Sequence, residues 1–77
     1  MKTQFLTNQL AECEMILRFA EKAQRRGELA VAAASAASVA SAVADYRKLF
    51  PNATEEQGKQ MDALASKANA IAKTLNA

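Results

Sequence analysis

Residues 29–44 read LAVAAASAASVASAVA, a stretch of sixteen residues without a charged side chain. Residues 30–44 within it are nine Ala, three Ser and three Val. Ala is the strongest helix former, so this stretch predicts a helix. Its small side chains let a neighbouring helix approach to the short end of the usual axis separation of about 8–10 Å. We therefore expect this helix at the centre of a helical bundle.

One face of this predicted helix should contact its neighbours. Residues three and four positions apart lie on the same side of a helix. On that basis the predicted seam consists of Leu29, Ala33, Ala36, Val39, Ala40 and Val43. The seam fits two compatible arrangements, the core of one chain and the contact between two copies in a homodimer.

Helical periodicity continues on both sides of this stretch. The predicted helices cover about residues 3–26, 28–50 and 54–75, and no segment alternates with the two-residue period of a strand. Pro51 disfavours helix at the residue before it and ends the second helix. Thr54 and Gln57 have the spacing of a capping box, which starts the third. The expected fold class is all-α, with residues 1–77 forming a single helical domain.

Gly27 decides whether the first two predicted helices are separate. Arg25 and Arg26 place cations in a last turn, and a Gly directly after them is typical of a helix C-terminus. A single helix over residues 3–50 would carry Gly27 in its interior at a cost of about 1 kcal/mol, which packing can override. We favour a break because both end signals coincide. The result is a three-helix bundle, or a hairpin plus a third helix, with an Ala-rich, close-packed core that dimerisation could complete.

Composition excludes most catalytic chemistry. The 77 residues include nineteen Ala, one Cys and no His, with a net charge of +2. The lone Cys13 has no partner for an internal disulfide, which fits a reducing, cytoplasmic compartment. It also has no His to act as its base, and the usual zinc sites cannot be built. We expect no enzymatic activity, no cofactor and no metal. The uncharged stretch is also shorter than the roughly 20 apolar residues of a transmembrane span.

Surface side chains supply the candidate sites. The apolar arc of the first helix is wider than one neighbour needs, and Met15 and Phe19 at its edge are candidate contacts for a partner. Two basic clusters lie at helix ends that an up-down bundle places at opposite poles. Cations there stabilise helix C-termini without any ligand. The candidates in these clusters are Lys22, Arg25 and Arg26 in the first, and Tyr46, Arg47 and Lys48 in the second.

The sequence favours a non-enzymatic protein–protein interaction module, such as an adaptor, assembly factor or inhibitor. By analogy at the level of fold alone, such small helical proteins are typical of bacteria and their phages or mobile elements. One alternative is nucleic-acid association through the basic helix ends, which has less support because the net charge is small. Another is a membrane-surface protein whose first helix lies flat with Phe5, Leu6, Leu10 and Phe19 inserted. No motif in the sequence identifies a family.

Overall fold

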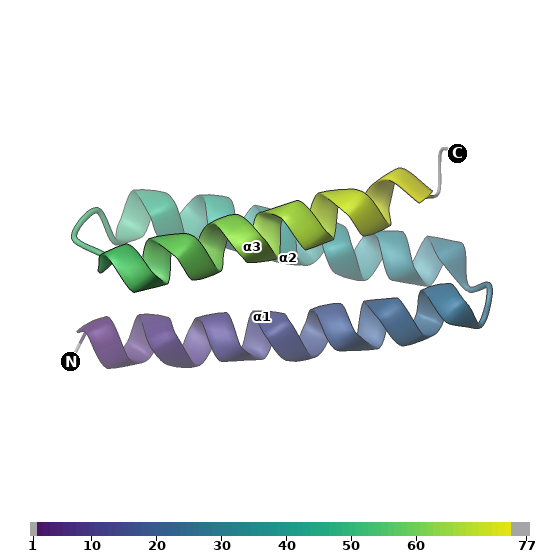
Figure 1. The fold of residues 1–77 in the computed structure, drawn as a ribbon, viewed down its shortest axis with the longest axis horizontal. Coiled ribbons are helices and arrows are strands. Elements are labelled where there is room, and N and C mark those ends of the chain that lie inside the picture. The colour runs from purple at the N-terminus through teal and green to yellow at the C-terminus, as the bar shows by residue number, and fades with distance from the viewer. Residues whose placement is uncertain (1, 75–77) are drawn as a thin grey trace.

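Three helices form the structure. The computed structural model describes residues 2–74, in which α1 spans Lys2–Arg25, α2 Leu29–Leu49 and α3 Glu55–Lys73. The helices run up, down and up along a molecule that measures 39 × 18 × 16 Å, and each packs against the other two (Figure 1). The predicted all-α three-helix bundle is confirmed. The expected end of the third helix at residue 75 lies outside the described residues.

The core combines small side chains from α2 with larger ones from α1 and α3. The larger buried residues are Leu6, Leu10, Leu17, Met61, Leu64 and Ile71. From α2 the core receives Ala32, Ala36, Val39 and Val43, all almost inaccessible to solvent. Because these side chains are short, the longer side chains of α1 and α3 fill the space beside them, and all of them form one core cluster.

The structure corrects one residue of the predicted seam. Ala33, Ala36, Val39 and Val43 are buried, and Ala40 is half-buried against the core. Leu29 is instead 37% exposed. Leu29 is the first residue of α2, directly after the turn at that end of the bundle, where neighbouring helices cover a side chain less completely than in the middle (Figure 1).

Gly27 separates α1 from α2 through a Schellman motif. Its φ of +82° lies in the left-handed region that favours Gly. The backbone N–H of Glu28 donates to the carbonyl of Ala23 at 2.9 Å, and the N–H of Gly27 donates to that of Gln24 at 3.1 Å. These two bonds satisfy carbonyls that the end of a helix leaves without partners. The predicted break is confirmed, and a continuous helix over residues 3–50 is wrong.

The two Gly residues give a matched pair of stability tests. A side chain at Gly27 meets no atom, so Gly27→Ala costs only the strain of the left-handed backbone, about 1–2 kcal/mol. Gly58 lies inside α3 with open space around it, so Gly58→Ala raises stability by up to about 1 kcal/mol. Urea unfolding followed by circular dichroism measures both. A Gly27→Ala variant more stable than the native chain would contradict the left-handed backbone conformation at this position.

A capping box starts α3, as predicted. The N–H of Gln57 donates to the Thr54 hydroxyl at 3.1 Å, and the N–H of Thr54 donates to Oε1 of Gln57 at 3.0 Å. The amide Nε2 of Gln57 also donates to the hydroxyl of Thr7 in α1 at 3.0 Å. This side chain is only 5% exposed, so the hydrogen bonds offset the cost of burying its amide. The cap thereby also ties α3 to α1.

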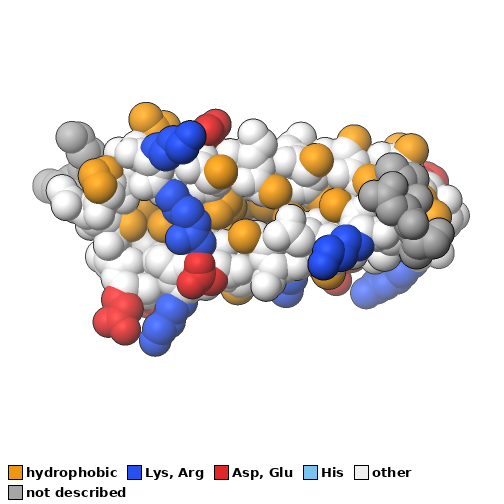
Figure 2. Space-filling model, turned by 90° about the horizontal axis from the view of Figure 1, so that it is seen from above, with side chains coloured by type: hydrophobic (Ala, Val, Ile, Leu, Met, Phe, Trp, Pro, Cys, Tyr) orange, Lys and Arg blue, Asp and Glu red, His pale blue; other side chains and the backbone are white. Residues whose placement is uncertain are grey.

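Helix α2 is long and apolar enough, by length and composition, to cross a membrane, and it is the one such helix in residues 2–74. The central helix of a bundle meets the same description, and α2 packs against both α1 and α3. The finding is consistent with the prediction that the chain has no transmembrane segment. Seen from the side of α2 and α3 (Figure 2), charged side chains of both signs are scattered among small hydrophobic ones.

Enlarging one buried Ala tests the close packing of α2. Ala36 is inaccessible to solvent, so Ala36→Leu forces the neighbouring helices apart and lowers the free energy of unfolding by about 1–3 kcal/mol. The neighbouring Ala37 is exposed, and Ala37→Leu should change it by less than about 0.5 kcal/mol. Thermal and urea unfolding distinguish the two variants. Equal effects would show that Ala36 faces no close neighbour.

Candidate interaction surface

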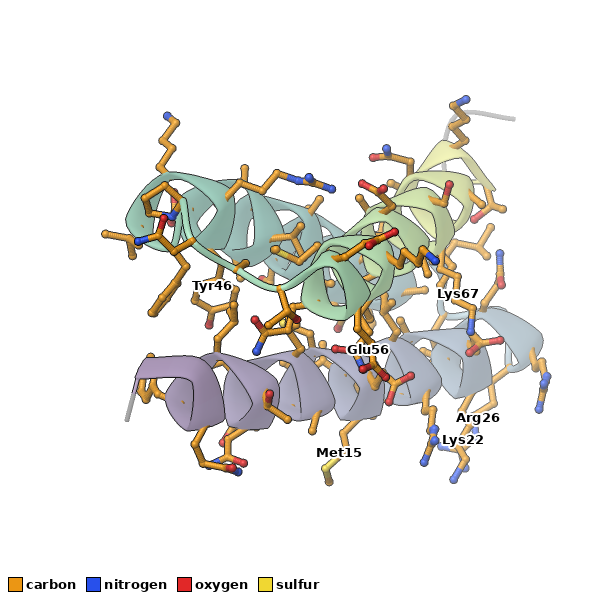
Figure 3. All side chains as sticks on the ribbon, turned by 60° about the vertical axis from the view of Figure 1, so that its left-hand side comes forward. Met15, Lys22, Arg26, Tyr46, Glu56 and Lys67 are labelled. Carbon is orange, nitrogen blue, oxygen red and sulfur yellow. The ribbon has the colours of Figure 1, made fainter. Side chains whose placement is uncertain are left out.

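A stripe of exposed side chains runs along the side of α1 that faces away from the other helices. We call Glu12, Met15, Phe19, Lys22 and Arg26 the outer stripe; their spacing of three, four, three and four residues keeps them on one face. Met15 is 67% exposed and Phe19 is 56% exposed. The labelled Met15, Lys22 and Arg26 side chains extend away from α2 and α3 (Figure 3).

The wide apolar arc of α1 is only partly used by the bundle. Leu6, Leu10 and Leu17 are buried against α2 and α3, whereas Phe5 and Ile16 remain exposed beside the outer stripe. In the folded bundle Leu6 and Leu10 are in the core, so the membrane-surface alternative, in which they insert together with Phe5 and Phe19, would require the bundle to open.

The basic residues predicted as candidate contacts lie in two separate places. Lys22, Arg25 and Arg26 are exposed at the C-terminal end of α1. Arg47 and Lys48 are at the C-terminal end of α2, which lies at the opposite end of the bundle (Figure 1). Within one chain the two clusters therefore do not join, as the up-down topology predicted. Of these basic residues, only Lys22 and Arg26 belong to the outer stripe.

Two candidates from the second cluster are already in contact with the other helices. The Tyr46 hydroxyl donates to Oε1 of Gln9 in α1 at 3.0 Å, and the Tyr46 ring packs on Phe50 at a centroid distance of 6.3 Å. The Arg47 guanidinium forms an ion pair with Asp62 in α3. Lys48 is exposed. Sequence reasoning missed Gln9 and Asp62 as partners, since nothing local to either residue indicates a contact so far along the chain.

The hollows of the surface offer little for chemistry. One hollow, of about 300 Å³, lies at the turn between α2 and α3 and is lined by Leu6, Leu49, Phe50, Pro51, Asn52, Ala53 and Gln57. These residues include no acid, base or nucleophile. A second, of about 170 Å³ between α1 and α3, includes Glu14 and Lys67 among otherwise uncharged residues. The largest of these, of about 640 Å³, is a shallow open surface at the start of α3, lined by Thr54, Glu55, Glu56 and Lys59. Among the described residues no group of three His, Cys, Asp or Glu could hold a metal ion.

The buried Cys13 of α1 and the half-buried Tyr46 of α2 hold their protons more tightly than usual. Burial raises the pKa of the Cys13 thiol above its ordinary value of 9.0, and the nearby Glu12 carboxylate adds to the effect. Burial likewise raises the pKa of the Tyr46 hydroxyl above 10.0, with further contributions from Cys13, Glu12 and Asp45. A buried thiol with a raised pKa is a poor nucleophile. Cys13 is therefore placed as a core residue.

Comparison of the chain with models of protein families, with curated proteins and with solved structures finds no match. The function is therefore inferred from the outer stripe and from the arrangement of the helices.

The raised pKa values of Cys13 and Tyr46 predict that the free energy of unfolding falls at alkaline pH. As the pH rises past 9, Cys13 and then Tyr46 lose their protons first in the unfolded chain, so the unfolded state binds fewer protons and the free energy of unfolding falls. Urea unfolding below pH 9 and above pH 10 measures this fall. The double variant Cys13→Ala, Tyr46→Phe should show a smaller fall, although it is less stable at every pH. An equal fall in both proteins would contradict the assignment.

Proposed function

We propose that the protein is a non-catalytic interaction module that binds a protein partner through the outer stripe of α1. The observation that carries this proposal is the exposure of Met15 and Phe19 on a helix face that neither α2 nor α3 covers. Large exposed apolar side chains leave a favourable burial energy unused, about 1.5–3 kcal/mol for a fully buried Phe or Met. A protein partner would recover part of it.

The surroundings of Met15 and Phe19 resemble a protein interface in composition. Aromatic residues, Met and Arg are enriched at such interfaces, and charged residues gather at their rims. Here the apolar pair lies in the middle, with Glu12 on one side and Lys22 and Arg26 on the other. An apolar patch without charges would favour aggregation, whereas flanking charges favour one partner and one orientation.

Nucleic-acid binding receives less support from the same geometry. A phosphate backbone is bound by several cations along one track. The two basic clusters lie at opposite ends of the bundle, and the Arg47 guanidinium is already paired with Asp62. The outer stripe also begins with a carboxylate, Glu12, which repels phosphate.

Site-specific crosslinking tests the proposal. A photo-reactive phenylalanine analogue in place of Phe19 should form a covalent adduct in cells, because the side chain would lie within the contact. Adduct formation should fall when unlabelled native chain is added in excess, but not when the chain carries Phe19→Glu. The same analogue at Ser66, exposed on α3, should give no competed adduct. An absence of adduct at Phe19, or equal competition by both chains, would overturn the proposal.

A further inference from the structure

The outer stripe has an order of charges that suits a second copy of itself. Along α1, the acidic Glu12 comes first, and the apolar Met15 and Phe19 and the basic Lys22 follow. Arg26 comes directly after the last residue of α1, and its N–H still donates to the carbonyl of Lys22 in the helical pattern. Glu12 precedes Phe19 by seven residues and Arg26 follows it by seven, and seven residues make nearly two full helical turns. The two opposite charges therefore lie on the same face as Phe19, each about 10 Å from it along the axis.

We propose that two copies of the chain associate antiparallel through the outer stripe, with Phe19 near the twofold axis. In this arrangement Glu12 lies opposite Arg26 of the partner subunit, and symmetry repeats the pair on the other side of Phe19. Such an interface is isologous, since the same patch serves both subunits. A parallel arrangement would instead set Glu12 against Glu12 and Arg26 against Arg26, so like charges disfavour it.

The exposed surface of the chain is larger than that of a compact monomer of the same mass. The chain exposes 5248 Å². A compact folded monomer of its mass, 8.2 kDa, exposes about 4,500 Å² by the usual scaling of surface with mass. The excess follows from the elongated shape of 39 × 18 × 16 Å. Side-by-side association of two such rods gives a more compact body and removes part of this excess.

Apolar contact at the centre would supply most of the affinity. Ile16 lies three residues before Phe19 and is exposed, so it extends the apolar centre toward α2. Two copies bring together two sets of Met15, Ile16 and Phe19 around the axis. Central apolar anchors surrounded by charges are the usual distribution of binding energy in a protein interface. This inference rests on the proposed function, because both assign the outer stripe to a protein contact.

The solution mass tests the inference. Light scattering on a size-exclusion column should give twice 8.2 kDa at high protein concentration and a fall toward 8.2 kDa on dilution. Phe19→Glu should give a monomer at every concentration. The matched control is Leu49→Ala, which changes an exposed apolar residue of α2 outside the outer stripe and should leave the dimer intact. Circular dichroism establishes that each variant is folded.

Charge reversal tests the antiparallel register separately. Glu12→Arg alone and Arg26→Glu alone each place like charges together twice in the dimer, so each should raise the dissociation constant roughly tenfold. The double variant exchanges the two charges and should restore the native dissociation constant. A dimer that Phe19→Glu does not disrupt would overturn the interface, and a double variant no better than the singles would overturn the register.

The crosslinking experiment separates this inference from the proposed function. An adduct at Phe19 with the mass of two chains supports both. A competed adduct of any other mass, from a chain that is monomeric at every concentration, overturns self-association while the interaction module stands. A monomeric chain without a competed adduct overturns both.

Discussion

The close approach of α1 and α3 to the small buried side chains of α2 is the contact on which the rest of the bundle depends. Ala32 and Ala36 present little more than a Cβ atom, so neighbouring backbones can come near. Each such contact is weak, but many add up at the density of a protein interior. The larger side chains that fill the remaining space come mainly from α1 and α3, including Leu17 and Leu64.

The same packing, with small side chains from α2 and larger ones from α1 and α3, leaves α1 with apolar side chains that the bundle does not cover. A helix of 24 residues with two neighbours buries one broad side, and Leu6, Leu10 and Leu17 occupy it. Met15 and Phe19, four residues apart and both exposed, lie on the opposite side, with charges before and after them. The protein thus joins a core built from small contacts to an exposed helix face with large ones. That contrast is the physical basis for proposing an interaction module and not an enzyme.

Much of the fold follows from local signals. Gly27 and the capping box at Thr54 are features that one or two helical turns determine, and the structure has both. Leu29 was misplaced because it is the first residue of α2, at the end of the bundle, and no pattern within α2 shows how far the neighbouring helices cover that end. The bonds from Gln57 to Thr7 and from Tyr46 to Gln9 join residues 50 and 37 positions apart. Helical periodicity gives the side of each helix but not the level at which two helices meet.

The outer stripe was only partly visible in the sequence. The edge position of Met15 and Phe19 on the apolar arc pointed to an exposed contact, and the structure places both in solvent. Tyr46 and Arg47 are also residue types that are common at interfaces, yet Tyr46 is hydrogen-bonded to α1 and Arg47 is paired with α3. Distinguishing a free Arg from a paired one requires knowing what lies across the helix interface, and that depends on tertiary structure.

Native-state hydrogen exchange tests most directly whether α2 is the shared centre of one cooperative bundle. Backbone amides of residues 32–43 should be among the slowest to exchange, and the protected amides of α1 and α3 should reach the same free energy of opening, because losing α2 removes the core of both. Faster exchange in residues 32–43 than in α1 and α3 would contradict a central role for α2, since α2 would then be the least stable helix of the three.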